Sequence, residues 1–153
     1  MISLNKGLFF ENSLTVLPWG ITRDAAWKIG SPTHYNLKDD FTRIKWEEPI
    51  LGGLNCGILA YLPNDKKLSE IHIWRILDPK KYPRDPWYAY MNIFDHLLSE
   101  IGAPEMTPSK GNLYAPILTW HLDDCTLSLI TGERFGDFTS LTIKKLKRSS
   151  TRR

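Results

Sequence analysis

A short motif that ends helices occurs twice in this chain. Residues 29–32 read Ile-Gly-Ser-Pro, and residues 101–104 read Ile-Gly-Ala-Pro. Glycine adopts the left-handed conformation found at many helix ends, and a proline shortly after it cannot continue the helix. Each copy is therefore typical of a helix terminus. Their repetition favours a chain built from two similar structural units.

Each copy follows a helical pattern and precedes extended segments. Thr22 is a candidate N-cap for a helix of about two turns that ends at Gly30. Residues 87–101 place apolar side chains at i, i+3, i+4 and i+7, which predicts an amphipathic helix. Three extended segments follow each helix, at 41–51, 54–62 and 68–77 in the first half and at 112–122, 125–131 and 138–146 in the second.

The last extended segments of the two halves align with each other. Ile71 corresponds to Leu141 and Ile73 to Ile143, and a tryptophan, Trp46 or Trp120, recurs near the end of the first long strand. Both tryptophans are expected in the core. We predict an α+β fold of two tandem α-βββ repeats, with an antiparallel sheet and helices packed on one face. A chance similarity of two such units is the alternative.

This prediction treats the chain as a single domain, 1–153, that is made of two similar halves. They cover about 14–77 and 86–146, joined by a proline-rich linker at 78–85 and followed by a basic tail at 144–153. The tail holds six of the 20 Lys and Arg residues and no acid, although the net charge is only +3. Residues 1–143 therefore carry 14 basic and 17 acidic groups. The body is mildly acidic.

The composition and cysteine content indicate a compartment. No apolar run approaches the roughly 18 residues of a membrane span, and the N-terminal segment lacks the long apolar run of a signal peptide. Neither Cys56 nor Cys125 belongs to a CxxC motif. We expect a cytoplasmic protein with reduced thiols and no membrane association.

Motifs for catalysis, metals and cofactors are missing from the sequence. It contains no dinucleotide-binding glycine motif, P-loop, GxSxG or HExxH. The best candidate pair is His121 with Asp123, which would share one side of a strand, as acid–base chemistry requires. A small enzyme using that pair is one alternative. The prediction is no catalytic residue, no metal and no cofactor.

The strand that includes Ile71 and Ile73 offers a candidate binding anchor. If these two face the core, His72 and Trp74 point the other way. Should the helices cover one face only, Trp74 stands on an open face, where tryptophan is typical of binding hot spots. The alternative is that residues 8–10 or the other repeat pack this second face.

Two α-then-antiparallel-β repeats in tandem resemble the beta-lactamase-inhibitor-protein-like architecture, which small outer-membrane assembly lipoproteins share. The chain departs from that group because it lacks a secretion signal and paired cysteines. As a small cytoplasmic protein it also resembles the immunity proteins of bacterial toxin–immunity systems, including contact-dependent growth inhibition. This resemblance implies a protein without catalytic residues that binds and blocks a cognate protein toxin.

An inhibitor of this kind needs a surface that complements its toxin. Many toxins act on nucleic acids through basic clefts, which clustered carboxylates would complement. The expected partner-binding residues are Asp39, Asp40, Glu47, Glu48, His72, Trp74, Asp123, Asp124 and Glu133. A nucleic-acid-binding protein using the tail at 144–153 is the other alternative, although nucleic acid is not the expected partner.

Overall fold

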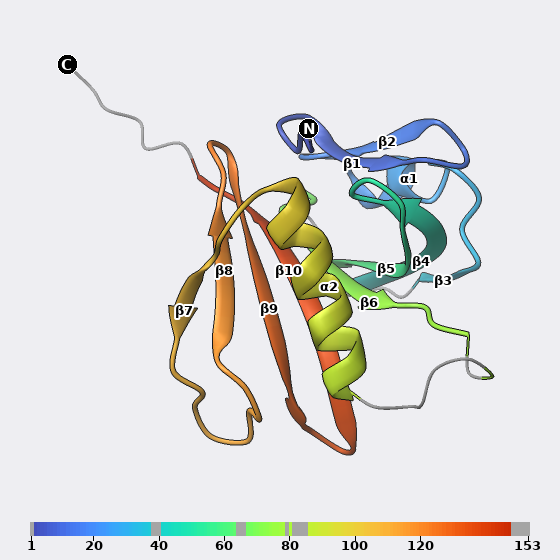
Figure 1. The fold of residues 1–153 in the computed structure, drawn as a ribbon. Coiled ribbons are helices and arrows are strands. Elements are labelled where there is room, and N and C mark those ends of the chain that lie inside the picture. Colours follow the sequence, from blue (N-terminus) through green and yellow to red (C-terminus); the bar gives the residue numbers. More distant parts are fainter. Residues whose placement is uncertain (1, 38–40, 64–66, 79, 81–85, 148–153) are drawn as a thin grey trace.

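The computed structural model describes residues 2–37, 41–63, 67–78, 80 and 86–147. The first half contains β1 (Gly7–Phe10), β2 (Thr15–Pro18), α1 (Arg23–Ala26), β3 (His34–Leu37), β4 (Phe41–Ile50), β5 (Leu54–Pro63) and β6 (Glu70–Arg75). The second half contains α2 (Pro86–Glu100), β7 (Glu105–Thr107), β8 (Ile117–His121), β9 (Cys125–Glu133) and β10 (Asp137–Lys145) (Figure 1).

Eight strands form one antiparallel sheet, and β1 and β2 form a separate hairpin. The strand order is β3-β4-β5-β6-β10-β9-β8-β7, so the last strands of the two halves meet at the centre. At this central pair Ile71 lies opposite Ile143, Ile73 opposite Leu141, and His72 opposite Thr142. The predicted α+β class with an antiparallel sheet is confirmed.

Two details differ from the sequence-based expectation. Each half contributes four strands to the sheet, because the short strands β3 and β7 add an edge to each side. Such short edge strands carry little periodic signal. The first helix has one turn rather than two: the Thr22 side chain makes no cap hydrogen bond, and tighter turns follow, with Ile29 N–H donating to Ala26 O.

The core lies on one face of the sheet. Directly opposed residues of antiparallel strands point to the same face, and the register lines up two rows of buried side chains. One row is Trp46, Ile58, Ile73, Leu141, Leu129 and Leu118; the other is Ile44, Ala60, Ile71, Ile143, Leu127 and Trp120. The expectation that both tryptophans are core residues is confirmed.

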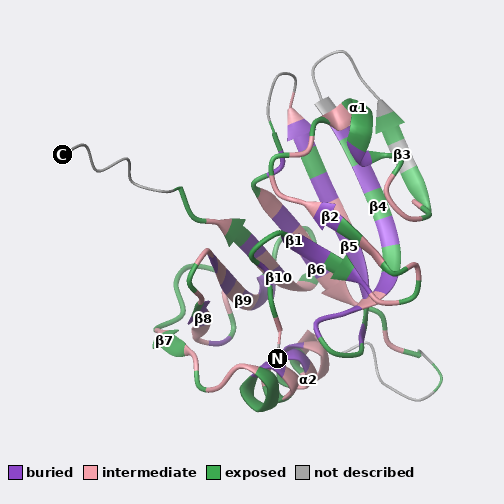
Figure 2. Ribbon diagram, turned by 90° about the horizontal axis from the view of Figure 1, so that it is seen from above, coloured by how far each residue is buried: buried purple, intermediate pink, exposed green. Residues whose placement is uncertain are grey.

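The hairpin and the long helix both cover this inner face. Phe10 of β1 contacts Trp46, with 5.4 Å between ring centroids, and Phe94 of α2 contacts Trp120 at 6.4 Å. Because Trp46 and Trp120 point to the same face, the hairpin and α2 lie on the same side of the sheet. Figure 2 shows buried and exposed residues alternating along β4, as a sheet covered on one side requires.

The long helix matches its predicted range closely. Its buried side chains are Tyr90, Ile93 and Leu97. On the same helix, His96 places Nε2 2.6 Å from the carbonyl oxygen of Leu51. This contact ties α2 to the β4–β5 turn. None of the helices in the described ranges is long and apolar enough to cross a membrane.

The predicted linker and tail are only partly described. In the linker, residues 79 and 81–85 lie outside the described residues, as do residues 148–153 of the tail. Lys144 and Lys145 belong to β10, where they pair with Thr126 and Cys125 of β9. The first two residues of the predicted tail are therefore strand residues of the sheet.

Candidate functional site

The sheet face opposite the core is the candidate binding surface. Its side chains are exposed or half-buried, and we call the part on β4, β5, β6 and β10 the open face: Arg43, Lys45, Glu47, Leu59, Tyr61, His72, Trp74, Thr142 and Lys144. Residues 8–10, which offered an alternative cover for this face, pack on the inner one, with Leu8 and Phe10 fully buried. The β1–β2 hairpin and α2 both cover the inner face. Trp74 therefore lies on the face that they leave open.

Trp74 has a fixed position on the open face. It lies directly opposite Gly57 on the neighbouring strand, and its ring occupies the space that a side chain at Gly57 would need. Lys45 Nζ lies 6.0 Å from the centroid of the Trp74 ring, within reach of a cation–π attraction. The indole is therefore held over Gly57 and remains half-buried.

The open face carries other residues of interface-forming types on β4 and β5. Glu47 also lies opposite Gly57, from the other side, so Glu47 and Trp74 flank this glycine. Tyr61 is 44% exposed, and the guanidinium carbon of Arg43 lies 5.9 Å from its ring centroid. Trp, Tyr and Arg are the residue types most enriched among interface hot spots.

The second half presents different chemistry on the same face. Thr142 lies opposite His72, with 3.4 Å between the Thr142 hydroxyl and His72 Nδ1. Lys144 pairs with Glu70 at 3.6 Å. The halves therefore differ here, with aromatic residues on the β4–β6 side and a threonine and a lysine on β10.

Three predicted site residues share the open face: Glu47, His72 and Trp74. Asp39 and Asp40 lie outside the described residues. Asp123 and Asp124 form the β8–β9 turn, and Glu133 ends β9 at the opposite end of that strand. Asp124 also approaches Lys145, with 3.9 Å between the charged atoms. The predicted carboxylates that the structure describes therefore do not gather into one patch.

The expectation for Glu48 needs a correction. This side chain is 8% exposed and points to the inner face, where one carboxylate oxygen accepts hydrogen bonds from the backbone N–H groups of Asn12 and Ser13, at 3.1 and 3.2 Å. Consecutive strand residues face opposite ways, so Glu47 and Glu48 cannot share a surface. Glu48 holds the β1–β2 turn against β4 instead.

His121 pairs with a carboxylate that the sequence analysis missed. Its Nε2 lies 2.9 Å from Glu105 of β7, and both side chains are more than half exposed. Asp123 lines the same shallow hollow of about 380 Å³ as His121. The described residues contain no group of three or more His, Cys, Asp and Glu side chains arranged to hold a metal ion.

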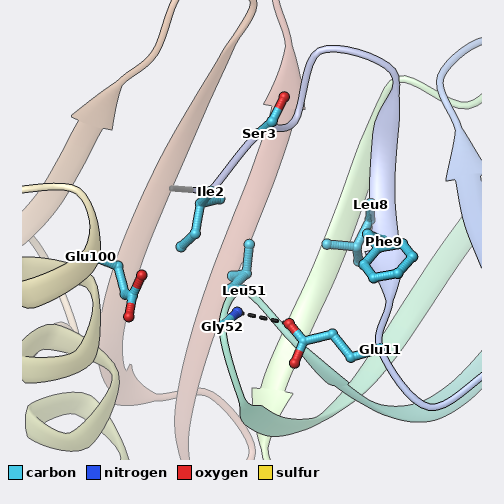
Figure 3. A pocket seen from close by; sticks show the side chains of 8 residues that line it. All are labelled: Ile2, Ser3, Leu8, Phe9, Glu11, Leu51, Gly52 and Glu100. Atoms are coloured by element: carbon cyan, nitrogen blue, oxygen red, sulfur yellow. Dashed lines mark hydrogen bonds between the residues drawn. The ribbon is translucent and has the colours of Figure 1, made fainter. Parts of the chain in front are cut away.

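A second hollow, of about 360 Å³, lies under the N-terminal segment. Ile2, Leu8 and Leu51 supply apolar lining, and Figure 3 shows Glu11 and Glu100 on either side of Gly52. Glu11 accepts a 2.8 Å hydrogen bond from the Gly52 N–H. Since Glu11 thereby fixes the β4–β5 turn, its position has a structural explanation.

The two cysteines are free and buried. Burial raises the pKa of the Cys56 thiol to about 12 and that of Cys125 to about 11. Reactive cysteines have lowered pKa values because the thiolate is the nucleophile. These thiols stay protonated at neutral pH and are poor nucleophiles.

A scan against protein-family models, a search of curated proteins and a search of solved structures each found no match to this chain. Its function is therefore inferred from its own surfaces. The open face combines an oriented tryptophan, an exposed tyrosine and an arginine, a composition that favours protein binding.

Proposed function

We propose that this chain is a cytoplasmic immunity protein that binds a cognate bacterial toxin and blocks it by occluding the toxin's active site. The observation that carries the proposal is Trp74, seated on Gly57 in the open face. A side chain that is already ordered loses little conformational entropy on binding, so more of its buried area contributes to affinity. The mechanism is steric and involves no catalytic step, metal or cofactor.

The charged residues of the open face favour selection of one partner over general attraction of oppositely charged proteins. Along β4 the open face presents two positive residues, Arg43 and Lys45, and then Glu47, which favours a partner with charges of both signs. A nuclease toxin with a basic phosphate-binding cleft would meet the Glu47 carboxylate, and Arg43 and Lys45 would pair with acidic groups beside that cleft. Glu47, beside Trp74, is the carboxylate that would enter such a cleft.

The proposal extends to the fold: the two halves are tandem repeats in the beta-lactamase-inhibitor-protein-like manner. The repeat alignment makes Ile71 equivalent to Leu141 and Ile73 equivalent to Ile143. If β6 and β10, which carry these residues, pair antiparallel, an internal two-fold axis should relate the two halves. The register fits, since Ile71 lies opposite Ile143, Ile73 opposite Leu141, and His72 opposite Thr142 between them. An experimental structure in which 41–75 superposes on 117–145 by a rotation near 180° would test it.

Affinity purification from the native cells tests the function. The tagged full chain is recovered from the soluble cytoplasmic fraction, and the eluate is assayed by mass spectrometry and for nucleic acid. We expect one protein partner at near-equal stoichiometry, whose enzymatic activity falls when the purified chain is added back. Nucleic acid that co-elutes and disappears when residues 148–153 are removed would favour the tail-based alternative instead.

Two tryptophan variants locate the binding surface. Trp74→Ala is expected to weaken partner binding by at least about tenfold, as for a central hot spot. Trp27→Ala is the matched control, because Trp27 is 37% exposed and follows α1, outside the sheet. Unfolding curves of both variants separate lost binding from lost stability. Undiminished binding by a folded Trp74→Ala variant would refute the proposed surface.

A further inference from the structure

A group of exposed aromatic residues lies at the end of the molecule where α2 begins. Trp87, in the first turn of α2, is 45% exposed, and Tyr114, which precedes β8, is 39% exposed. Together with Pro86 and Asp137 they line a hollow of about 410 Å³, which we call the aromatic notch. Figure 1 shows the start of α2 and the β9–β10 turn at this same end.

Hydrogen bonds hold the walls of the aromatic notch together. The Tyr114 hydroxyl donates to one carboxylate oxygen of Asp137 at 2.6 Å, and the Thr139 hydroxyl donates to the Pro86 carbonyl oxygen at 2.7 Å. Trp87 packs edge-on against Tyr90, with 6.1 Å between ring centroids. The notch is therefore formed by α2, β10 and the loop before β8, which these hydrogen bonds hold together.

Two carboxylates, Asp137 and Glu133, lie near the Tyr114 hydroxyl. The hydrogen bond from Tyr114 to Asp137 raises the pKa of Tyr114 to about 12, and partial burial and the negative charges of Asp137 and Glu133 act in the same direction. Against them stand Arg134, which is exposed, and the N-terminus of α2, which contributes roughly half a positive charge. A carboxylate beside two aromatic faces is the arrangement that binds organic cations through cation–π attraction.

The adjacent turn presents a side chain with no role inside the molecule. Phe135 is fully exposed, at 104%, and its backbone is left-handed, with φ of 57°. A bulky residue rarely adopts this conformation, and an exposed phenylalanine loses the hydrophobic benefit of burial. Both costs are explained if Phe135 becomes buried against a partner.

We propose that the aromatic notch binds the cationic side chain of an arginine or lysine presented by a protein partner, with Phe135 packing on the apolar part of the same partner segment. Trp87 and Tyr114 supply the aromatic faces, and the Asp137 carboxylate supplies the opposite charge. The notch is separate from the open face, so this inference does not depend on the proposed function.

An NMR titration of the ¹⁵N-labelled full chain tests the proposal, with N-acetyl-L-arginine N-methylamide as the probe. The citrulline analogue is the matched neutral control, since it keeps the shape and removes the charge. We expect saturable shifts of the Trp87 indole N–H and of the Phe135 and Gly136 amides with arginine, with a dissociation constant on the order of millimolar. The citrulline analogue should bind at least about fivefold more weakly.

Two variants make the test specific. Asp137→Asn removes the charge while leaving an acceptor for Tyr114, and Trp87→Leu removes an aromatic face; each should weaken arginine binding at least about fivefold. Asp123→Asn, at the β8–β9 turn, is the control and should bind like the wild type. Shifts that do not saturate, equal binding of the citrulline analogue, or unchanged binding by both folded variants would overturn the proposal.

Discussion

The ring of Trp74 rests on the backbone of Gly57, on the face of the sheet that the helix and hairpin leave uncovered. These residues are directly opposed in register, and any side chain at position 57 would occupy the volume of the indole. Glycine usually weakens a strand because it has no side chain to pack. Here the indole of Trp74 fills that space, so the glycine fixes the position of an aromatic residue on the open face.

Replacing this glycine should displace the ring. In Gly57→Ala the new methyl group overlaps the Trp74 indole, and relieving that overlap should cost about 1–3 kcal/mol in free energy of unfolding. Urea denaturation measures the cost. The same substitution in a Trp74→Ala background is the control, because the overlap is then gone and most of the cost should vanish. Equal costs in both backgrounds would show that the ring does not lie on Gly57.

The two core tryptophans should make similar contributions to the free energy of unfolding. Trp46 donates its indole N–H to Ile29 O and Trp120 donates to Gly102 O, each at 2.8 Å, so both bond to a carbonyl of the repeated helix-end motif. Trp46→Phe and Trp120→Phe each leave that carbonyl without its partner and shrink a filled core. We expect each to lower the free energy of unfolding by about 2 kcal/mol or more.

Equilibrium unfolding of the two single variants and the double variant checks this parallel. The sites lie in different halves and have different aromatic neighbours, so their effects should add to within about 0.5 kcal/mol. A stability loss confined to one of the two tryptophans would show that the matching hydrogen bonds are not equivalent. It would also weaken the case for tandem repeats.

The sequence predicted the parts of this fold that have long periodic patterns. The apolar stripe of 87–101 located α2, and the parity of Ile71 and Ile73 put Trp74 opposite the core. The short edge strands β3 and β7 were missed because three or four residues carry too little alternation. Phe135 of the β9–β10 turn and Asp137 at the start of β10 were missed because exposure at the end of a hairpin depends on tertiary placement.

Pairs of adjacent acidic residues misled the site prediction for a related reason. Glu47 and Glu48 look like one charged cluster in the sequence, yet a strand sends them to opposite faces. His121 was matched with Asp123, its neighbour in sequence, whereas its partner is Glu105 on the adjacent strand. Strand pairing brings together residues that are distant in sequence, and the sequence alone does not reveal that register.

Glu48 should matter for stability and not for partner binding. Glu48→Ala leaves the N–H groups of Asn12 and Ser13 without their acceptor and should lower the free energy of unfolding by about 2 kcal/mol. Glu47→Ala is the matched control on the open face and should have little effect on stability. Hydrogen exchange at the Asn12 and Ser13 amides should accelerate only in the Glu48 variant. Unchanged exchange there would contradict the assigned role.

Cys56 should make the folded state less stable in alkali. Burial raises the pKa of this thiol from 9.0 to about 12, so between these values the unfolded chain has lost a proton that the folded chain keeps. A folded state that binds more protons loses stability as pH rises, by up to about 1.4 kcal/mol per pH unit for one thiol. Urea unfolding at pH 8 and pH 10 should therefore show a larger loss for the wild type than for Cys56→Ala. The substitution lowers stability at both pH values by leaving a cavity, so the comparison is between the two pH-dependent changes. If these are identical, Cys56 titrates normally in the folded protein and is not shielded by the core.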